Sequence, residues 1–154
     1  MITAQDIMTP DPITVVPETE IPEAARLLLE KNINGIPVVN NDKELVGIIC
    51  QSDLVAMQRK IPFPSLFTLL DSLVPLSSLS RMEKEIKRIA AIRVEDAMTK
   101  DPEFVYRDTT LEELAEIMVM KKYHTLPVLE GRRLVGVVGK ADVLRTLMKQ
   151  NTKA

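Results

Sequence analysis

The sequence predicts an α/β protein of the α+β type, in which two copies of one β-α-β-β-α unit pack face to face about an approximate twofold axis. The main observation is that the chain repeats itself at a shift of 90 residues, which becomes 89 after a one-residue deletion in a turn. Three pairs of segments match: DIMTPDP (6–12) with DAMTKDP (96–102), NINGIPVV (32–39) with KYHTLPVL (122–129), and LVGII (45–49) with LVGVV (134–138). The 154 residues are 45% hydrophobic, which is enough for one substantial core. Two copies are the simplest explanation, because one isolated unit of this size would leave an apolar face uncovered.

Each copy is expected to begin with a short β-prone segment, at 13–16 and at 104–106, followed by an amphipathic helix. The helix is predicted from apolar residues that recur with i, i+3, i+4, i+7 spacing. These residues are Ile21, Ala24, Ala25 and Leu28 in copy one, and Leu111, Leu114, Ala115 and Met118 in copy two. In copy two the helix start has the spacing of a capping box, with Thr110 three residues before Glu113.

Two apolar strands and a second helix complete each copy. The strands are expected at 36–39 and 45–49 in copy one, and at 126–129 and 134–138 in copy two. A polar turn separates the two strands of each pair. The second helix is expected to start near Ser52 and near Ala141.

Residues 59–92 match neither copy and are predicted to be an apolar and helical insertion. The copies therefore span 1–58 and 93–154. Between 61 and 80 the only charged residue is Asp71, and the stretch 81–93 (RMEKEIKRIAAIR) is charged and expected to be helical. The insertion can add to the core or cap the repeats, or it can form a homodimer surface or dock an effector protein.

The charge balance and the residue types exclude several classes of function. With 20 basic and 22 acidic residues the formal net charge is -2, so no overall field attracts nucleic acid or an anionic membrane. A single cysteine, Cys50, excludes an internal disulfide and fits a reducing cytosol. The first residues lack the pattern of a secretion signal, and prolines interrupt the apolar stretch 61–80, so neither secretion nor a membrane span is expected. We therefore expect a cytoplasmic protein.

An aspartate recurs six residues after the glycine of each LVG segment, as Asp53 and as Asp142. Such an aspartate can be a helix N-cap, because its carboxylate accepts hydrogen bonds from free backbone N–H groups. It can also hold a ligand, because one carboxylate can accept hydrogen bonds from two hydroxyl groups. The sequence leaves both roles open, and they are compatible.

The ordered elements D-x-M-T-x-D-P, h-P-V and L-V-G-h-h-x-x-x-D, where h is apolar, resemble those of a tandem pair of cystathionine-β-synthase (CBS) domains, or Bateman module. The resemblance covers 1–58 and about 93–150. It implies a regulatory sensor rather than an enzyme, which binds adenosine-containing ligands such as AMP, ADP, ATP or S-adenosylmethionine in clefts between the repeats. It also implies assembly into disc-like dimers.

The resemblance implies two ligand sites, in which Asp53 and Asp142 hold a ribose. The residues implied to line the sites in copy one are Thr14, Val16, Pro17, Ile33, Gly35, Ile36, Pro37 and Ser52, and in copy two Val105, Tyr106, Tyr123, His124, Thr125, Pro127 and Lys140. The sequence departs from the family pattern where a Ser or Thr is expected, because Cys50 and Gly139 stand there. Ser52 is a possible substitute in copy one.

Copy two offers more positive charge to a phosphate, through Lys140, with Lys121, Lys122 and Arg145 elsewhere in the repeat. We therefore expect unequal sites, with the Asp142 site better suited to phosphates. Each of these side chains also has an ordinary interpretation. The lysines can be a solvated surface, His124 can be a partly buried and satisfied histidine, and Tyr106 and Tyr123 can pack rather than stack on a base.

An enzyme is disfavoured. A cysteine nucleophile would have to be Cys50 with His124 as its base, but Cys50 ends an apolar strand and is expected to be a buried thiol. The chain has no G-x-S-x-G, H-E-x-x-H or Walker motif and no implied cofactor or metal, apart from an adenine nucleotide as regulatory ligand. Nucleic-acid binding would rest on 81–93 alone, where a solvated helix is favoured. The remaining alternative is a module that dimerises or binds an unidentified effector protein without a small ligand.

Overall fold

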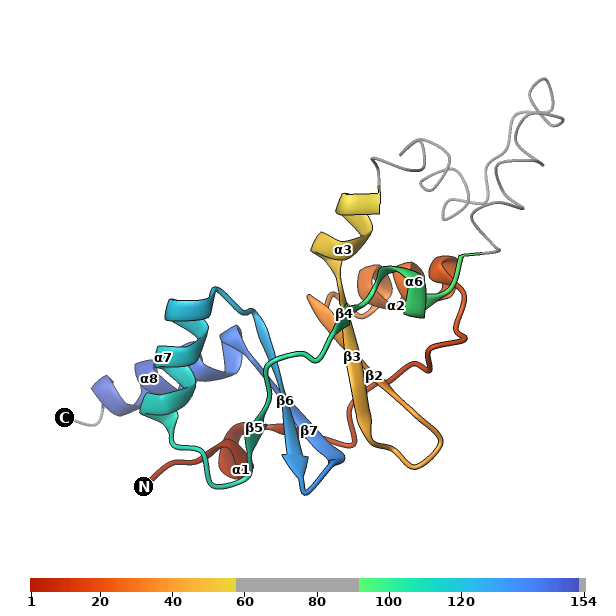
Figure 1. The fold of residues 1–154 in the computed structure, drawn as a ribbon. Helices are drawn as coiled ribbons and strands as arrows, with labels where there is room; N and C mark the ends of the chain where they lie inside the picture. The colour runs from red at the N-terminus through yellow and green to blue at the C-terminus, as the bar shows by residue number, and fades with distance from the viewer. Residues whose placement is uncertain (58–91, 153–154) are drawn as a thin grey trace, which may run out of the picture. The chain divides into compact units, whose positions relative to one another are not determined.

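The computed structural model describes residues 1–57 and 92–152, which form two compact units (Figure 1). The Asp53 unit consists of residues 14–38, 46–57 and 92–100, and the Asp142 unit of residues 1–13, 39–45 and 101–152. The expected insertion at 59–92 lies outside the described residues, apart from Ile92. Each unit has its own sheet, helices and hydrophobic core, so the predicted α+β class with two related repeats is confirmed.

The Asp53 unit has a three-stranded sheet in the order β2-β3-β4. Its strands are β2 (Gly35–Val39), β3 (Leu45–Cys50) and β4 (Thr99–Lys100), and its helices are α2 (Ile21–Glu30), α3 (Gln51–Ala56) and α6 (Val94–Ala97). Val15 adds a single parallel bridge to Val38 at the place where a strand at 13–16 was expected. The expected strand is therefore reduced to one bridge.

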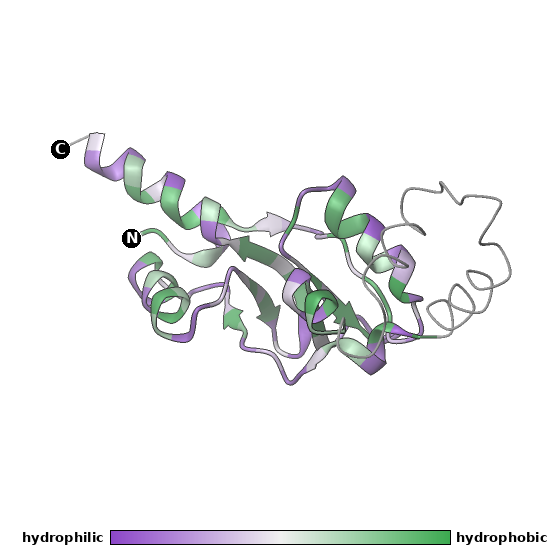
Figure 2. Cartoon of the chain, turned by 90° about the horizontal axis from the view of Figure 1, so that it is seen from above, coloured by the Kyte–Doolittle hydropathy of each residue, from purple (hydrophilic) through white to green (hydrophobic). Residues whose placement is uncertain are grey.

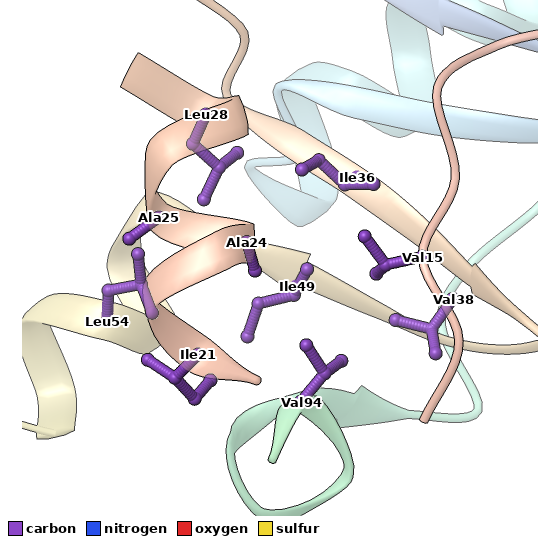
Figure 3. Close-up of a cluster of buried hydrophobic side chains, with 10 residues drawn as sticks. All are labelled: Val15, Ile21, Ala24, Ala25, Leu28, Ile36, Val38, Ile49, Leu54 and Val94. Carbon is purple, nitrogen blue, oxygen red and sulfur yellow. The ribbon is translucent and has the colours of Figure 1, made fainter. Parts of the chain in front are cut away.

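The core of the Asp53 unit forms around α2, as its apolar spacing predicts. The four residues of the i, i+3, i+4, i+7 pattern are all buried: Ile21, Ala24, Ala25 and Leu28. They point toward side chains from β2, β3, α3 and α6, such as Ile36, Ile49 and Val94 (Figure 3). The opposite face of α2 is exposed, because it carries charged residues that favour water.

The Asp142 unit has a four-stranded sheet in the order β1-β7-β6-β5. Its strands are β1 (Thr9–Pro10), β5 (Val105–Tyr106), β6 (Thr125–Glu130) and β7 (Arg133–Gly139), and its helices are α1 (Ala4–Ile7), α7 (Leu111–Lys121) and α8 (Lys140–Thr152). β6 and β7 form an antiparallel hairpin, and β5 runs parallel to β6. Figure 2 shows the apolar colour concentrated on the longer strands, while the helices carry both colours. The capping box predicted at α7 is confirmed, because Thr110 and Glu113 each accept a hydrogen bond from the other's backbone N–H.

The two D-x-M-T segments are exchanged between the copies. β1, which precedes copy one's helix in sequence, pairs antiparallel with β7 of copy two, with Thr9 opposite Val137. β4, which opens copy two, pairs antiparallel with β3 of copy one, with Ile48 opposite Thr99. Neither a helix nor a strand was expected in these segments from their sequence. Each forms one turn of helix followed by a two-residue edge strand.

Each D-x-M-T segment crosses a strand at the glycine of an LVG segment, and we call these two contacts the crossings. Each crossing requires the glycine. A Cβ atom on Gly47 would lie 2.6 Å from Met98 Sδ and 3.0 Å from the carbonyl oxygen of Thr99. On Gly136 it would lie 2.5 Å from Met8 Sδ and 3.0 Å from the carbonyl oxygen of Thr9. Real Cβ atoms do not approach other atoms so closely, so only glycine lets the methionine of the D-x-M-T segment pack onto the strand.

Candidate functional site: two helix-start carboxylates

Asp53 and Asp142 each lie in the first turn of the helix that follows a buried strand. Asp53 Oδ2 accepts a hydrogen bond of 2.7 Å from the backbone N–H of Cys50, and Asp142 Oδ2 accepts one of 2.8 Å from Gly139. The helices begin at Gln51 and Lys140, so each aspartate is the third helical residue. The N-cap role considered from sequence is therefore wrong in detail. The carboxylate instead reaches back to the N-cap residue, as the acidic partner in a capping box does.

The same bond is made by the first aspartate of each D-x-M-T segment. Asp6 Oδ2 accepts from the backbone N–H of Thr3 at 2.8 Å, and Asp96 Oδ2 accepts from that of Arg93 at 3.0 Å. Both of these aspartates are exposed, whereas Asp53 and Asp142 are half-buried. The bond through Oδ2 is therefore a general way in which this chain starts a helix, and it does not by itself indicate a ligand site.

The second oxygen, Oδ1, distinguishes the two carboxylates. Asp53 Oδ1 accepts a hydrogen bond of 3.1 Å from the hydroxyl of Thr99, in β4. Asp142 Oδ1 accepts one from the guanidinium of Arg145, one turn further along α8. One carboxylate thus has a neutral partner from a distant segment, and the other has a charged partner from its own helix.

The thiol of Cys50 lies beside Asp53 and is poorly suited to act as a nucleophile. Burial, and to a lesser degree the negative charge of Asp53, raises the pKa of Cys50 to about 11. Thiolate is the reactive form, and it is scarce at neutral pH when the pKa is this high. Cys50 ends a strand and is poorly reactive, as expected, but it is half-buried rather than buried.

The residue before β2 and the residue before β6 each form a backbone hydrogen bond with the start of the second helix of the same copy. The backbone N–H of Lys140 donates to the carbonyl oxygen of His124 at 2.8 Å, and that of Gln51 donates to Asn34 at 3.0 Å. His124 and Lys140 are exposed, as is Ser52. Asn34 and His124 therefore lie beside the helix start that carries the aspartate.

The other predicted site residues divide into buried and accessible sets. The buried ones are Gly35, Ile36, Pro37, Val105, Thr125 and Pro127; the exposed or half-buried ones are Thr14, Val16, Pro17, Ile33, Tyr106 and Tyr123. Ile36 and Val105 belong to the two hydrophobic cores. The side chains of the buried set are thus largely inaccessible from solvent.

Several side chains of copy two have protein partners of their own. Tyr106 lies edge-on to Phe104, with ring centroids 5.5 Å apart, and Tyr123 packs against the core. Lys121 Nζ lies 2.9 Å from a carboxylate oxygen of Glu103. Lys122 takes the left-handed conformation that ends α7, with φ of 59°.

The sequence profile of the CBS domain matches the chain twice, at residues 4–60 and 94–149. The chain belongs to the CBS domain family. A curated relative, the "CBS domain-containing protein CBSX2, chloroplastic" of Arabidopsis thaliana, is 30% identical over 154 residues, which cover 96% of this chain and 64% of that protein. This CBS pair thus spans less than two thirds of the plant relative.

Solved structures resemble the CBS pair along almost its whole length. The crystal structure of CBSX2 in complex with AMP is 27% identical, with a TM-score of 0.74, and covers 98% of this chain and 99% of that one. The CBS domain pair of protein MJ0100, in complex with 5'-methylthioadenosine and S-adenosyl-L-methionine, is 25% identical, with a TM-score of 0.69 and coverage of 96% and 97%.

Two functional candidates in this CBS pair were not nominated from the sequence. Thr99 was matched to Thr9 within the repeated D-x-M-T but was treated only as part of the repeat; its recurrence was the available signal. Arg145 was counted as a nearby cation, although its place three residues after Asp142 on a predicted helix already indicates an ion pair.

Two structural features are absent from residues 1–57 and 92–152. No cluster of three or more His, Cys, Asp or Glu side chains there is arranged to hold a metal ion. No helix in those ranges has the length and apolar character needed to cross a bilayer.

Proposed function

We propose that this CBS pair is a regulatory module that binds an adenosine-containing ligand, with Asp53 and Asp142 as the residues that hold the ribose. The observation that carries the proposal is the state of the two carboxylates. Each is half-buried and fixed through Oδ2, and each presents Oδ1 to a partner that lies at or near the surface. A ribose has two adjacent hydroxyl groups. A carboxylate that is already fixed can accept hydrogen bonds from them with little loss of side-chain entropy.

The related structures support the ligand class. CBSX2 is described with AMP, and the MJ0100 pair with 5'-methylthioadenosine and S-adenosyl-L-methionine, and all three ligands contain adenosine. The segments 33–37 and 123–127, each a short loop and the start of a strand, would read the adenine mainly with peptide groups, since most of their side chains are buried. Binding of an effector protein and a cytoplasmic location stay predictions.

A titration calorimetry experiment with AMP tests the role of the carboxylates. Asp142→Ala should weaken AMP binding roughly tenfold or more, because a hydrogen bond to a charged group is lost. The loss should be smaller for Asp53→Ala, because copy two offers more positive charge to the phosphate. Asp96→Ala is the matched control, because it removes the same Oδ2 bond at an exposed helix start.

One result would contradict the ribose role of the carboxylates, and another would contradict the inequality of the two sites. If Asp53→Ala and Asp142→Ala weaken AMP binding by no more than Asp96→Ala does, the carboxylates do not hold the ribose. If both weaken it equally, and by more than the control, the ribose role stands and the inequality of the two sites is wrong.

A binding role is favoured over catalysis by the state of the only thiol. The pKa of Cys50 is raised to about 11, so the nucleophile that a cysteine enzyme needs is nearly absent at neutral pH. The absence of any cofactor requirement stays a prediction.

A second candidate function, assembly into a homodimer, is favoured by exposed apolar side chains on α7 and α8. These helices pack against each other in the Asp142 unit. The exposed side chains are Val119 and Met120 on α7, at 73% and 74%, and Leu144, Leu147 and Met148 on α8. Such a group of apolar side chains is typical of an interaction surface.

The homodimer is tested by light scattering after size exclusion. Leu144→Glu and Met148→Glu should lower the mass to that of one chain, whereas Gln150→Glu, which adds the same charge to the same helix, should not. A mass that stays unchanged in both variants would contradict a dimer through α8.

A further inference from the structure

Arg145 occupies the carboxylate oxygen that a ligand would need. Asp142 Oδ2 is committed to the backbone of Gly139, so only Oδ1 is free to exchange partners, and Arg145 donates to that oxygen. The side chain of Arg145 is 68% exposed and that of Asp142 is 22% exposed. The ion pair is therefore screened by water, and it can open without leaving the guanidinium buried.

The equivalent oxygen of Asp53 has no such competitor. The repeat aligns Arg145 with Ala56, three residues after Asp53, and an alanine cannot donate a hydrogen bond from its side chain. Asp53 Oδ1 accepts instead from the hydroxyl of Thr99. A ribose hydroxyl can replace another hydroxyl like for like, because both are neutral donors.

Exchange at Asp142 differs because a neutral hydroxyl replaces a cation. A ligand without charge gives up the ion pair and offers nothing to the guanidinium in return. A ligand with a phosphate supplies an anion near the released Arg145, which favours pairing between them. The cost of opening the pair is then partly recovered.

We propose that Arg145 competes with the ligand for Asp142 and so makes the Asp142 site select phosphate-bearing nucleotides over neutral nucleosides, a selection that the Asp53 site lacks. This inference rests on the proposed function, since it assigns a specificity-determining role at the same carboxylate.

Adenosine is the probe, because it carries the ribose but no charge. In the Asp53→Ala background, which leaves the Asp142 site alone, Arg145→Ala should tighten adenosine binding about threefold, the size expected for an exposed ion pair. AMP should gain less than adenosine, because the same substitution removes a cation near its phosphate. Lys149→Ala, which removes an exposed cation from the last turn of α8, should change neither affinity.

The converse substitution gives a second and independent test. Ala56 is exposed, so Ala56→Arg should be accommodated and should install the competitor beside Asp53. In the Asp142→Ala background it should weaken adenosine binding about threefold, by the same reasoning. Raising the salt concentration should tighten adenosine binding wherever the arginine is present and have little effect where it is absent, because salt weakens the ion pair.

Three outcomes overturn the inference, and they separate it from the proposed function. Adenosine binding that is unchanged or weakened by Arg145→Ala shows that the arginine does not compete. Unchanged binding in the Ala56→Arg variant, with its fold checked by circular dichroism, leads to the same conclusion. If the unsubstituted chain binds neither adenosine nor AMP, the proposed function fails and this inference fails with it.

Discussion

Asp53 and Asp142 are equivalent side chains in the two units, but one of their oxygen atoms has a different hydrogen-bond partner in each unit. In both, Oδ2 of the aspartate accepts from the residue before the helix, at 2.7 and 2.8 Å. Oδ1 accepts from Thr99 in one unit and from Arg145 in the other. The bond that starts the helix has been kept in both copies, while the partner of the outward oxygen has diverged. The part of the motif that is free to diverge is the part that faces a ligand in our proposal.

A second pair of contacts shows no such divergence. The Gly47–Met98 and Gly136–Met8 crossings agree to within 0.1 Å in the distance from a would-be Cβ to the sulfur. These crossings hold each D-x-M-T segment onto a strand of the other copy. Substitutions at equivalent positions should therefore have equal effects at the crossings and at the bond through Oδ2, and unequal effects at the partners of Oδ1.

The largest expected effect is on the two crossings. Gly136→Ala and Gly47→Ala should each lower the free energy of unfolding by about 1–3 kcal/mol, because an added methyl forces the methionine and a backbone carbonyl apart. The two losses should be similar, as judged by urea unfolding followed by circular dichroism. A loss at one glycine only would show that the crossings are not equivalent.

A double substitution identifies the cause of that loss. Met8→Ala alone leaves a void, but in the Gly136→Ala chain it also removes the clash, so the combined loss should be smaller than the sum of the two single losses. Additive losses would mean that the added methyl clashes with the carbonyl oxygen of Thr9 instead.

The next effect concerns the bond through Oδ2. Asp53→Ala and Asp142→Ala should each lower the free energy of unfolding by about 1 kcal/mol, as the loss of a helix cap does. Asp142→Ala also frees Arg145, but that side chain is already largely exposed, so its release adds little. Equal melting temperatures for the two variants would support the common role. A much larger loss at Asp142 would assign the stabilisation to the ion pair.

The elements that were predicted correctly are those with a local signal. α2 and α7 follow from apolar residues at helical spacing, and the capping box at Thr110 follows from two residues three positions apart. β1 and β4 could not be found in this way, because they are two residues long and exposed, so they carry no alternating pattern. Their pairing with a strand of the other copy is determined by tertiary contacts.

The same distinction applies to the candidate site. Arg145 lies on the same helix as its partner, so its ion pair with Asp142 could be anticipated from spacing alone. Thr99 lies 46 residues from Asp53, and it reaches the carboxylate only because β4 pairs with β3. The repeat located both aspartates, but it could not show which of their oxygens was committed to the backbone.

The pH dependence of stability should differ between the helix starts, because Cys50 precedes one and Gly139 the other. The pKa of Cys50 is raised from 9.0 to about 11 on folding, so the folded state holds the proton more tightly. The contribution of the protonated thiol to the free energy of unfolding is fully present below pH 9 and is lost as the pH rises through about 11. After a discount for partial exposure, the loss at pH 10 should stay below about 1 kcal/mol.

Thermal melts between pH 8 and pH 11 measure this effect against Cys50→Ala. The unsubstituted chain should lose more stability over that range than the variant, which has no thiol to ionise. Parallel curves for the two proteins would show that the thiol does not contribute.

The smallest effect is expected at Thr99. Thr99→Val removes the hydroxyl that donates to Asp53 Oδ1 but keeps the shape of the side chain. Because Thr99 is exposed, water can replace the lost donor, so the free energy of unfolding should fall by about 0.5 kcal/mol or less. Thr9→Val is the matched control, since Thr9 occupies the same position beside β7, where Asp142 is paired with Arg145 instead. A double-mutant cycle with Asp53→Ala isolates the bond. Coupling between Thr99 and Asp53, with none between Thr9 and Asp142, would establish that the two carboxylates have different hydrogen-bond partners.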